Sequence, residues 1–155
     1  MDTAIQAAFN AGVIVVISAG NDSCNTANYS LTRIPEAFVV GATDASRLNL
    51  GLDARATFSR IGANISVFAP GTAVLLLNFN GTPITANGTS FSAPYMAGMF
   101  AVGCQAAGTL CATATNAGVA YTALRNIGLL NTVVDSNGQP LPAPSTPRFI
   151  SRQPW

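Results

Sequence analysis

The sequence predicts an α/β fold in which a mostly parallel central sheet is flanked by layers of helices. Helical patterns alternate with short apolar runs along the chain. The first of these runs is a continuous stretch of β-branched residues, as in strands buried on both faces. A polar turn follows it, as at the carboxyl edge of an open parallel sheet. With 155 residues, the chain is long enough for one domain with a sizeable core.

The first expected elements are a short helix and a strand. The helix is capped by Asp2 or Thr3 and ends at Gly12, where a left-handed residue is favoured. Three apolar residues share one of its faces at helical spacing: Ile5, Ala8 and Phe9. The run 13–17 follows and predicts a central parallel strand, buried on both faces.

Four more apolar runs predict strands in the middle of the chain. They lie at residues 37–40, 65–68, 74–77 and 84–86. Pro70 stops the second of them, because proline cannot donate to a strand ladder. A polar loop is expected at 18–34, a turn-rich excursion at 44–53, and a turn at 81–83 between the last two strands.

Two helices and a tail complete the predicted organisation. A long apolar helix is expected at about 90–107, and a second helix at about 117–126. Pro94 fits the first of them because it lies near the first turn, where backbone donors have no intrahelical partner. A proline-containing tail at 139–155 ends the chain, which has no internal repeat and no low-complexity linker.

The composition excludes several classes of function. Charged residues make up 8% of the chain, and seven arginines against six acidic residues give a net charge of +1. No basic stripe is present, so a nucleic-acid partner is not expected. The longest apolar runs, such as 13–17, are far shorter than the ~20 residues of a membrane span. The first residues lack the pattern of a secretory signal, so any export signal is expected upstream of Met1.

The three cysteines are Cys24, Cys104 and Cys111, and they allow at most one disulfide within the chain. Cys104 and Cys111 are close enough in sequence to pair at the end of a helix. Buried free thiols are the alternative, and the sequence leaves both open.

Two short polar segments are the candidates for chemistry. Residues 18–21 follow the first strand, at the sheet edge where ligands bind in open parallel sheets. Residues 88–90 begin the long helix, whose unpartnered N–H groups and dipole favour a developing negative charge. An amide such as Asn21 could supply a second donor to an oxyanion held there.

These segments belong to a larger set of motifs. In chain order the set is Ala19-Gly-Asn21, Gly41-Ala-Thr-Asp44, Ala56-Thr-Phe-Ser59, Phe68-Ala-Pro-Gly71 and Gly88-Thr-Ser-Phe-Ser-Ala-Pro94 with Ala97-Gly98. From about residue 4 to 130, the chain resembles the carboxyl-terminal half of a subtilisin-like serine protease, nearest to the proteinase K branch. The resemblance implies the three-layer fold of that family, here only its carboxyl-terminal part.

The resemblance assigns roles to individual residues. Ser90 matches the nucleophile, in a motif supported by Gly88, Thr89 and Pro94. The Asn21 amide and the Ser90 backbone N–H match the two donors of the oxyanion hole. Three further residues match one wall of the pocket that receives the substrate side chain before the scissile bond: Ser18, Ala19 and Gly20. Their small size favours an apolar or aromatic side chain. Thr89 and Ser92 are expected to be structural hydroxyls.

The catalytic histidine and aspartate of the family lie before the matched region, and this chain contains no histidine. The resemblance therefore implies that residues 1–155 form the carboxyl-terminal part of a secreted endopeptidase domain that cleaves peptides or proteins. The missing amino-terminal half would be its partner. An inactive fragment or pseudoprotease that acts only as a binding half-domain is the alternative. The chain alone is expected to be inactive and prone to aggregate.

Calcium is the one cofactor that the resemblance raises. Proteinase K-like members bind it through carbonyls near residues 34–37, around Pro35, and through an aspartate at the position of Ser66. A neutral hydroxyl is a poor substitute for a carboxylate, so no metal site is expected within this chain.

Overall fold

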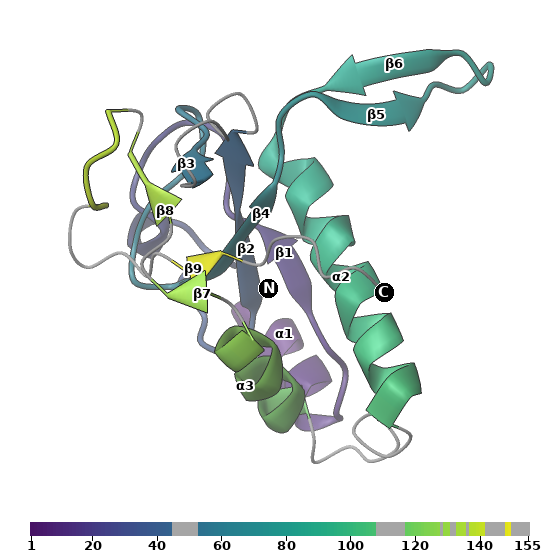
Figure 1. Cartoon of the computed structure of the whole chain (residues 1–155). Helices are drawn as coiled ribbons and strands as arrows, with labels where there is room; N and C mark the ends of the chain where they lie inside the picture. The colour runs from purple at the N-terminus through teal and green to yellow at the C-terminus, as the bar shows by residue number, and fades with distance from the viewer. Residues whose placement is uncertain are drawn as a thin grey trace.

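A computed structural model describes residues 1–44, 53–107, 117–127, 129–130, 133–135, 137–141 and 148–149. The fold is α/β, as predicted, with helices packed on a mixed sheet (Figure 1). Residues 45–52 of the expected excursion at 44–53, most of the tail at 139–155 and Cys111 lie outside the described residues.

The described strands form a seven-stranded sheet with β2 (Phe38–Asp44) and β4 (Ile65–Pro70) at its centre. The other strands are β1 (Val16–Ser18), β3 (Asp53–Arg55), β7 (Leu129–Leu130), β8 (Val133–Val134) and β9 (Arg148–Phe149). The pairs β1–β2, β2–β4, β4–β9 and β3–β8 are parallel, whereas β2–β3 and β7–β9 are antiparallel. The prediction of a mostly parallel sheet is therefore confirmed.

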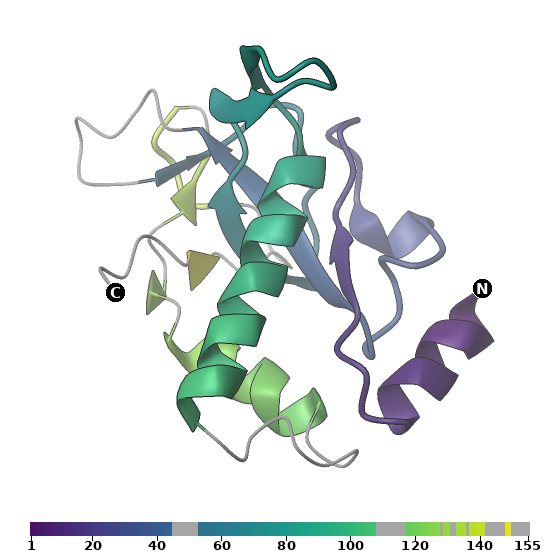
Figure 2. The same cartoon turned by 90° about the vertical axis from the view of Figure 1, so that its right-hand side faces the viewer.

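Two long helices cover one face of the sheet. They are α2 (Thr89–Ala107) and α3 (Ala117–Ile127), and Figure 2 looks onto α2 lying across the strands. Phe38 of β2, Phe100 of α2 and Tyr121 of α3 meet in edge-on or tilted ring contacts, with centroids 4.9 to 5.7 Å apart. Such contacts add to the stability already gained from burying the rings.

The opposite face of the central strands is also buried, because strand side chains alternate between faces. A second core cluster forms there around Val39, Ile65 and Phe68. Val133 of β8 and Leu141 close it from the carboxyl-terminal segments, and Ile5 of helix α1 (Asp2–Asn10) packs against it. The two clusters explain why β2 is buried from its first residue to its sixth.

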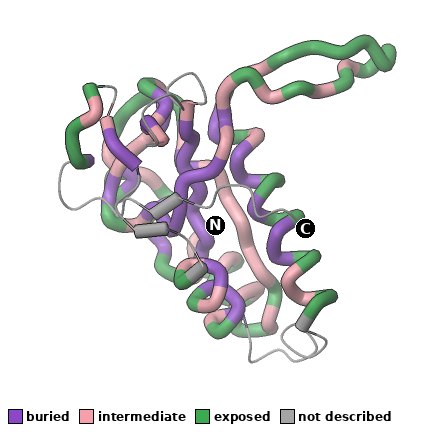
Figure 3. The backbone as a smooth tube through the Cα atoms, in the orientation of Figure 1, coloured by how far each residue is buried: buried purple, intermediate pink, exposed green. Residues whose placement is uncertain are grey.

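A two-stranded hairpin extends away from the sheet. It consists of β5 (Val74–Leu77) and β6 (Pro83–Ala86), which pair antiparallel as the sequence predicts. Its side chains are mostly exposed, as the green tube at the upper right of Figure 3 shows. Leu75 and Leu77 are 72% and 71% exposed, and Phe79 at the tip is fully exposed.

Two details of the amino-terminal segment differ from expectation. Helix α1 (Asp2–Asn10) has Met1 at its N-cap, without a side-chain hydrogen bond, so the predicted cap by Asp2 or Thr3 is wrong. Asp2 pairs with Arg33 instead, at 2.9 Å. Strand β1 is shorter than predicted and only half-buried, because among the described strands it pairs with β2 alone.

Several other expectations are confirmed. Gly12 ends α1 with a φ of +83°, and Pro94 lies inside the first two turns of α2. Of the two alternatives left open for the cysteines, Cys104 is disulfide-bonded, whereas Cys24 carries a free, exposed thiol; Cys111 lies outside the described residues. None of the described helices combines the length and the hydropathy needed to span a membrane.

Candidate active site

The two candidate segments lie next to each other at the end of β1. Residues 18–21 leave the carboxyl end of this strand, and α2 begins beside them at Thr89. The start of the helix is fixed by two contacts with the end of β4. The Gly88 N–H donates to the Gly71 carbonyl at 2.8 Å, and the buried Ser92 hydroxyl lies 3.1 Å from the Pro70 carbonyl. Ser92 is thus a structural hydroxyl.

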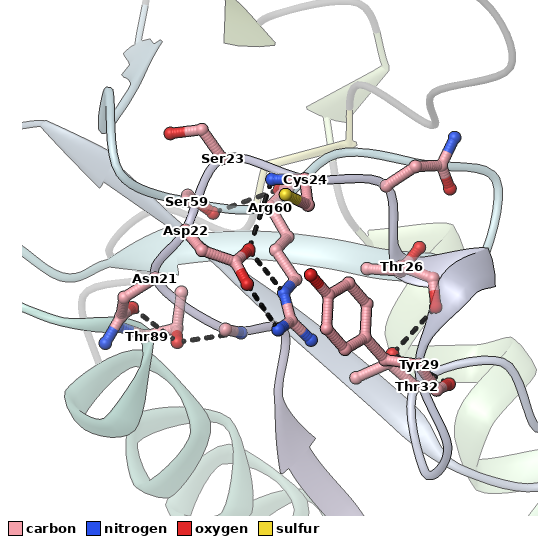
Figure 4. A network of polar contacts seen from close by, with 12 residues as sticks. Asn21, Asp22, Ser23, Cys24, Thr26, Tyr29, Thr32, Ser59, Arg60 and Thr89 are labelled. Carbon is pink, nitrogen blue, oxygen red and sulfur yellow. Dashed lines mark hydrogen bonds and ion pairs between the residues drawn. The ribbon is translucent and has the colours of Figure 1, made fainter.

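Asn21 is joined to the first residue of the helix by two hydrogen bonds (Figure 4). Its Oδ1 accepts from the Thr89 backbone N–H at 3.0 Å and from the Thr89 hydroxyl at 2.9 Å. The Gly20 N–H approaches the same hydroxyl at 3.1 Å. Because Oδ1 is engaged, the orientation of the amide is fixed and its Nδ2 remains available as a donor. Thr89, fully buried, therefore positions Asn21.

Ser90 is exposed at the mouth of a pocket of about 540 Å³. The expected wall residues Ser18, Ala19 and Gly20 line this pocket together with Ser90 and Ala93. The lining also includes residues 30–32 and Arg60. The structure therefore brings the predicted nucleophile and the predicted pocket wall together around one cavity.

Arg60 links this pocket to the loop after Asn21. Its Nε and Nη2 pair with the two carboxylate oxygens of Asp22, both at 2.7 Å, and its guanidinium lies 3.2 Å from the centre of the Tyr29 ring (Figure 4). The bond to Arg60 holds the pKa of Asp22 well below its usual value. Side-chain hydrogen bonds, first with Cys24 and then with the accepting carboxylate of Asp22, raise the pKa of Tyr29 to about 12. Asp22 is therefore a structural carboxylate engaged with a cation.

The surroundings of Ser66 do not fit a calcium ligand. Its buried hydroxyl oxygen accepts from the Val39 N–H at 3.2 Å and from Nη2 of Arg125 at 3.1 Å. A calcium ion needs oxygen lone pairs directed towards it, whereas here a guanidinium already faces the oxygen. The nearby Glu36 carbonyl lies 3.0 Å from the Tyr121 hydroxyl. The donors around Ser66 thus suit a neutral acceptor and not a divalent cation.

Comparison with known proteins decides the family. A model of the subtilase family of peptidases matches residues 1–141 of this chain. The chain belongs to the subtilase family. The motifs around Asn21 and Ser90 therefore lie within the matched region of a subtilase.

Individual relatives of this subtilase agree with the family match. A subtilisin-like protease of Coccidioides posadasii is 37% identical over 103 residues, which cover 65% of this chain and 25% of the relative. An extracellular serine proteinase of a Thermus species is 38% identical over 104 residues, covering 66% of this chain and 24% of the relative. The chain thus spans about a quarter of the length of these relatives.

A solved structure supports the same fold for the subtilase chain. The crystal structure of a cold-adapted subtilisin-like serine proteinase superposes with a TM-score of 0.78 at 28% sequence identity. The match covers 96% of this chain and 48% of the solved one. The chain therefore corresponds to about half of that proteinase.

Two features of this subtilase site were not predicted from the sequence. The positioning role of Thr89 was not anticipated, since its hydroxyl was expected only to be structural. The contact of Arg60 with Asp22 and Tyr29 was also missed, because these residues are 31 to 38 positions apart. The sequence contained one signal that pointed to Arg60. This residue directly follows the motif 56–59 and adds a charge to an otherwise small and apolar stretch.

Proposed function

We propose that this chain carries the nucleophile and the oxyanion hole of a secreted serine endopeptidase. The observation that supports it most directly is the double hydrogen bond between Asn21 and Thr89, which orients the amide at the residue that precedes Ser90. In this proposal Ser90 Oγ attacks the carbonyl carbon of the scissile bond and its proton passes to a base. The developing oxyanion is held by Asn21 Nδ2 and the Ser90 N–H.

The next steps follow from proton balance. The tetrahedral intermediate collapses, the carbon–nitrogen bond breaks, and the base returns its proton to the leaving amine. Water then hydrolyses the acyl group from Ser90 with help from the same base. The base lies outside these 155 residues, since the chain has no histidine. The carboxylate nearest to Asn21 in sequence, Asp22, is paired with Arg60.

The extent of the family match gives the proposal its structural setting. The solved proteinase is about twice as long as this chain, and the relatives are longer still. We infer that the remaining half of the same domain supplies the base and the second pocket wall. The lack of a base favours, as a second candidate, a non-catalytic half-domain that only binds its partner or a peptide.

A fluorophosphonate probe, which reacts with activated serines, tests this function. The protein as its source produces it should be labelled at Ser90, and the label should disappear in Ser90→Ala. In Asn21→Ala, peptide turnover should fall about 10²- to 10³-fold, the range found when a protease of the subtilisin type loses this donor. Thr3→Ala, on the exposed face of α1, and Asn28→Ala, at the exposed end of the short 3-10 helix Thr26–Asn28, are the matched controls.

The two candidates give different results. Labelling and turnover that survive in Ser90→Ala would contradict the proposal. A source protein that binds peptide but is never labelled would support the non-catalytic candidate. Clear turnover by the purified 155-residue chain alone would refute an external base.

A further inference from the structure

Among the residues that the structure describes, the lining of the pocket beside Ser90 includes one charged side chain. Arg60 lines it together with small and apolar residues: Val16, Ile17, Ala19, Gly20 and Ala93. Its partner Asp22 is not among the lining residues and lies on the outer, solvent-facing side, 43% exposed. The guanidinium of Arg60 therefore faces the pocket, whereas the carboxylate of Asp22 does not.

Arg60 is held in this place by three independent contacts. Both carboxylate oxygens of Asp22 bind it, and the ring of Tyr29 lies against its guanidinium. The third contact is with Gly20, where a Cβ would come within 2.5 Å of Arg60 Nε. Only 14% of the Arg60 side chain is exposed. A side chain fixed in this way loses little entropy when it binds a further partner.

The guanidinium retains donors for such a partner. It has five N–H groups in a planar fork, and Asp22 engages only Nε and Nη2. No described residue hydrogen-bonds Nη1. An acceptor on a substrate side chain could therefore bind there, whereas an ammonium or guanidinium would be repelled.

We propose that Arg60 is a specificity-determining residue, and that the pocket selects a substrate side chain with a short apolar stem and an acceptor end, that of glutamine or glutamate. The inference rests on the proposed function, because the pocket becomes a specificity pocket only if Ser90 is the nucleophile. It refines the apolar preference expected from Ser18, Ala19 and Gly20. The small wall contacts the stem, and Arg60 binds the end of the side chain.

Peptide substrates that differ only in the residue before the scissile bond test this inference on the source protein. Glutamine and glutamate should be cleaved with higher kcat/KM than leucine, and lysine should be cleaved poorly. In Arg60→Leu the advantage of glutamine over leucine should fall by about ten- to a hundredfold, the range for a hydrogen bond to a charged group. An unchanged glutamine-to-leucine ratio would overturn the inference.

Two further variants serve as controls for the effect of Arg60→Leu. Asp22→Asn with Arg60→Leu removes both charges together, so no unpaired carboxylate remains, and it should show the same loss of preference. Arg33→Leu removes an arginine whose partner is Asp2, and it should leave the ratios unchanged. A loss of preference in Arg33→Leu equal to that in Arg60→Leu would contradict the assignment.

A binding measurement separates this inference from the proposed function. Peptides that end in a carboxyl-terminal glutamine, glutamate or leucine are titrated into the Ser90→Ala source protein, and the NMR signal of Arg60 Nε–H is followed. A shift with glutamine and glutamate but not with leucine would support the role of Arg60 even if no hydrolysis were found. Hydrolysis that depends on Ser90, without a shift at Arg60 and without a glutamine preference, would overturn only the role of Arg60.

Discussion

At the scale of single residues, the site depends on a few positions that accept only one type of residue. Gly20 is the clearest of them, since its φ is +110° and Arg60 occupies the space of a Cβ. Its N–H also approaches the Thr89 hydroxyl that holds Asn21. A single glycine thus joins the predicted pocket wall, the predicted oxyanion donor and the pocket cation.

Gly20→Ala should destabilise the protein by about 1–3 kcal/mol, because it adds backbone strain and a clash with Arg60. Gly81→Ala is the matched control, with a φ of +80° and no atom within 4 Å of the added Cβ. The loss of unfolding free energy, measured by urea unfolding, should therefore be larger in Gly20→Ala than in Gly81→Ala. The difference is the free-energy cost of the clash with Arg60. Equal losses of unfolding free energy would show that Arg60 moves aside freely.

Tyr29 gives the stability a dependence on alkaline pH. Its pKa is raised to about 12 from the usual 10.0, first by Cys24 and then by Asp22. The folded state therefore keeps this proton longer than the unfolded state does. The contribution to stability is complete below about pH 10 and is lost as the pH rises towards 12.

Tyr29→Phe keeps the ring against Arg60 but removes the ionising hydroxyl. The urea midpoint of the variant should decline less steeply between about pH 10 and 12 than that of the parent chain. Tyr95→Phe, at an exposed position in α2, serves as the control. The same steep decline in Tyr29→Phe as in the parent would rule out Tyr29 as the source.

At the scale of elements, the β5–β6 hairpin is the most exposed apolar part of the described chain. Replacing Leu75, Leu77 and Phe79 by threonine should lower light scattering at a fixed protein concentration, because exposed apolar strands promote association. The unfolding midpoint should change little, since these side chains bury little surface.

A control for the hairpin uses exposed valines on helices, Val102→Thr and Val119→Thr, at 41% and 52% exposure. These should leave the scattering nearly unchanged. If the helix variants reduced scattering as much as the hairpin variants did, general surface hydrophobicity would be responsible and not the hairpin.

Helix α3 determines the expected response to calcium. Its Arg125 donates to Ser66, where the family resemblance would place a metal ligand. The thermal midpoint of the 155-residue chain should therefore be the same in calcium and in chelator. The double variant Ser66→Asp with Arg125→Gln should gain a calcium-dependent rise. A chelator-sensitive parent chain that becomes insensitive in Ser66→Ala would contradict this assignment.

At the scale of the whole molecule, the chain corresponds to about half of the solved subtilisin-like proteinase. The match covers 48% of the solved proteinase, so we expect the native product to have an intact mass near twice 15.8 kDa. Mass spectrometry after capture with an antibody to residues 145–155 measures this directly. A native mass of 15.8 kDa would favour the non-catalytic candidate.

Local patterns predicted much of the fold. The apolar runs 37–40 and 65–68 predicted β2 and β4, and the glycine at the end of α1 and the proline in α2 lie as expected. The burial of β1 was overestimated, because periodicity reports which residues are apolar and not whether a neighbouring strand covers them. The Asp2 cap failed for a similar reason, since Arg33 competes for its carboxylate from 31 residues away.

The candidate site also has one part that local patterns predict and one part that they do not. Ser90 and Asn21 stand in contiguous motifs, so their placement could be expected from short segments. The network of Arg60, Asp22 and Tyr29 joins two loops that local patterns cannot bring together. Its geometry depends on the register of β2 against β4, which only the folded sheet defines.

The hydrogen bonds between Asn21 and Thr89 span 68 positions of the chain. The Asn21 amide is therefore oriented only after β1, β2 and β4 have paired and α2 has docked. A nascent or partly folded chain holds the serine without its oriented donor. Under the proposed function, the order of folding would thus keep peptide hydrolysis slow in the cell that makes the protein, because full activity would need the donor that only the completed sheet orients.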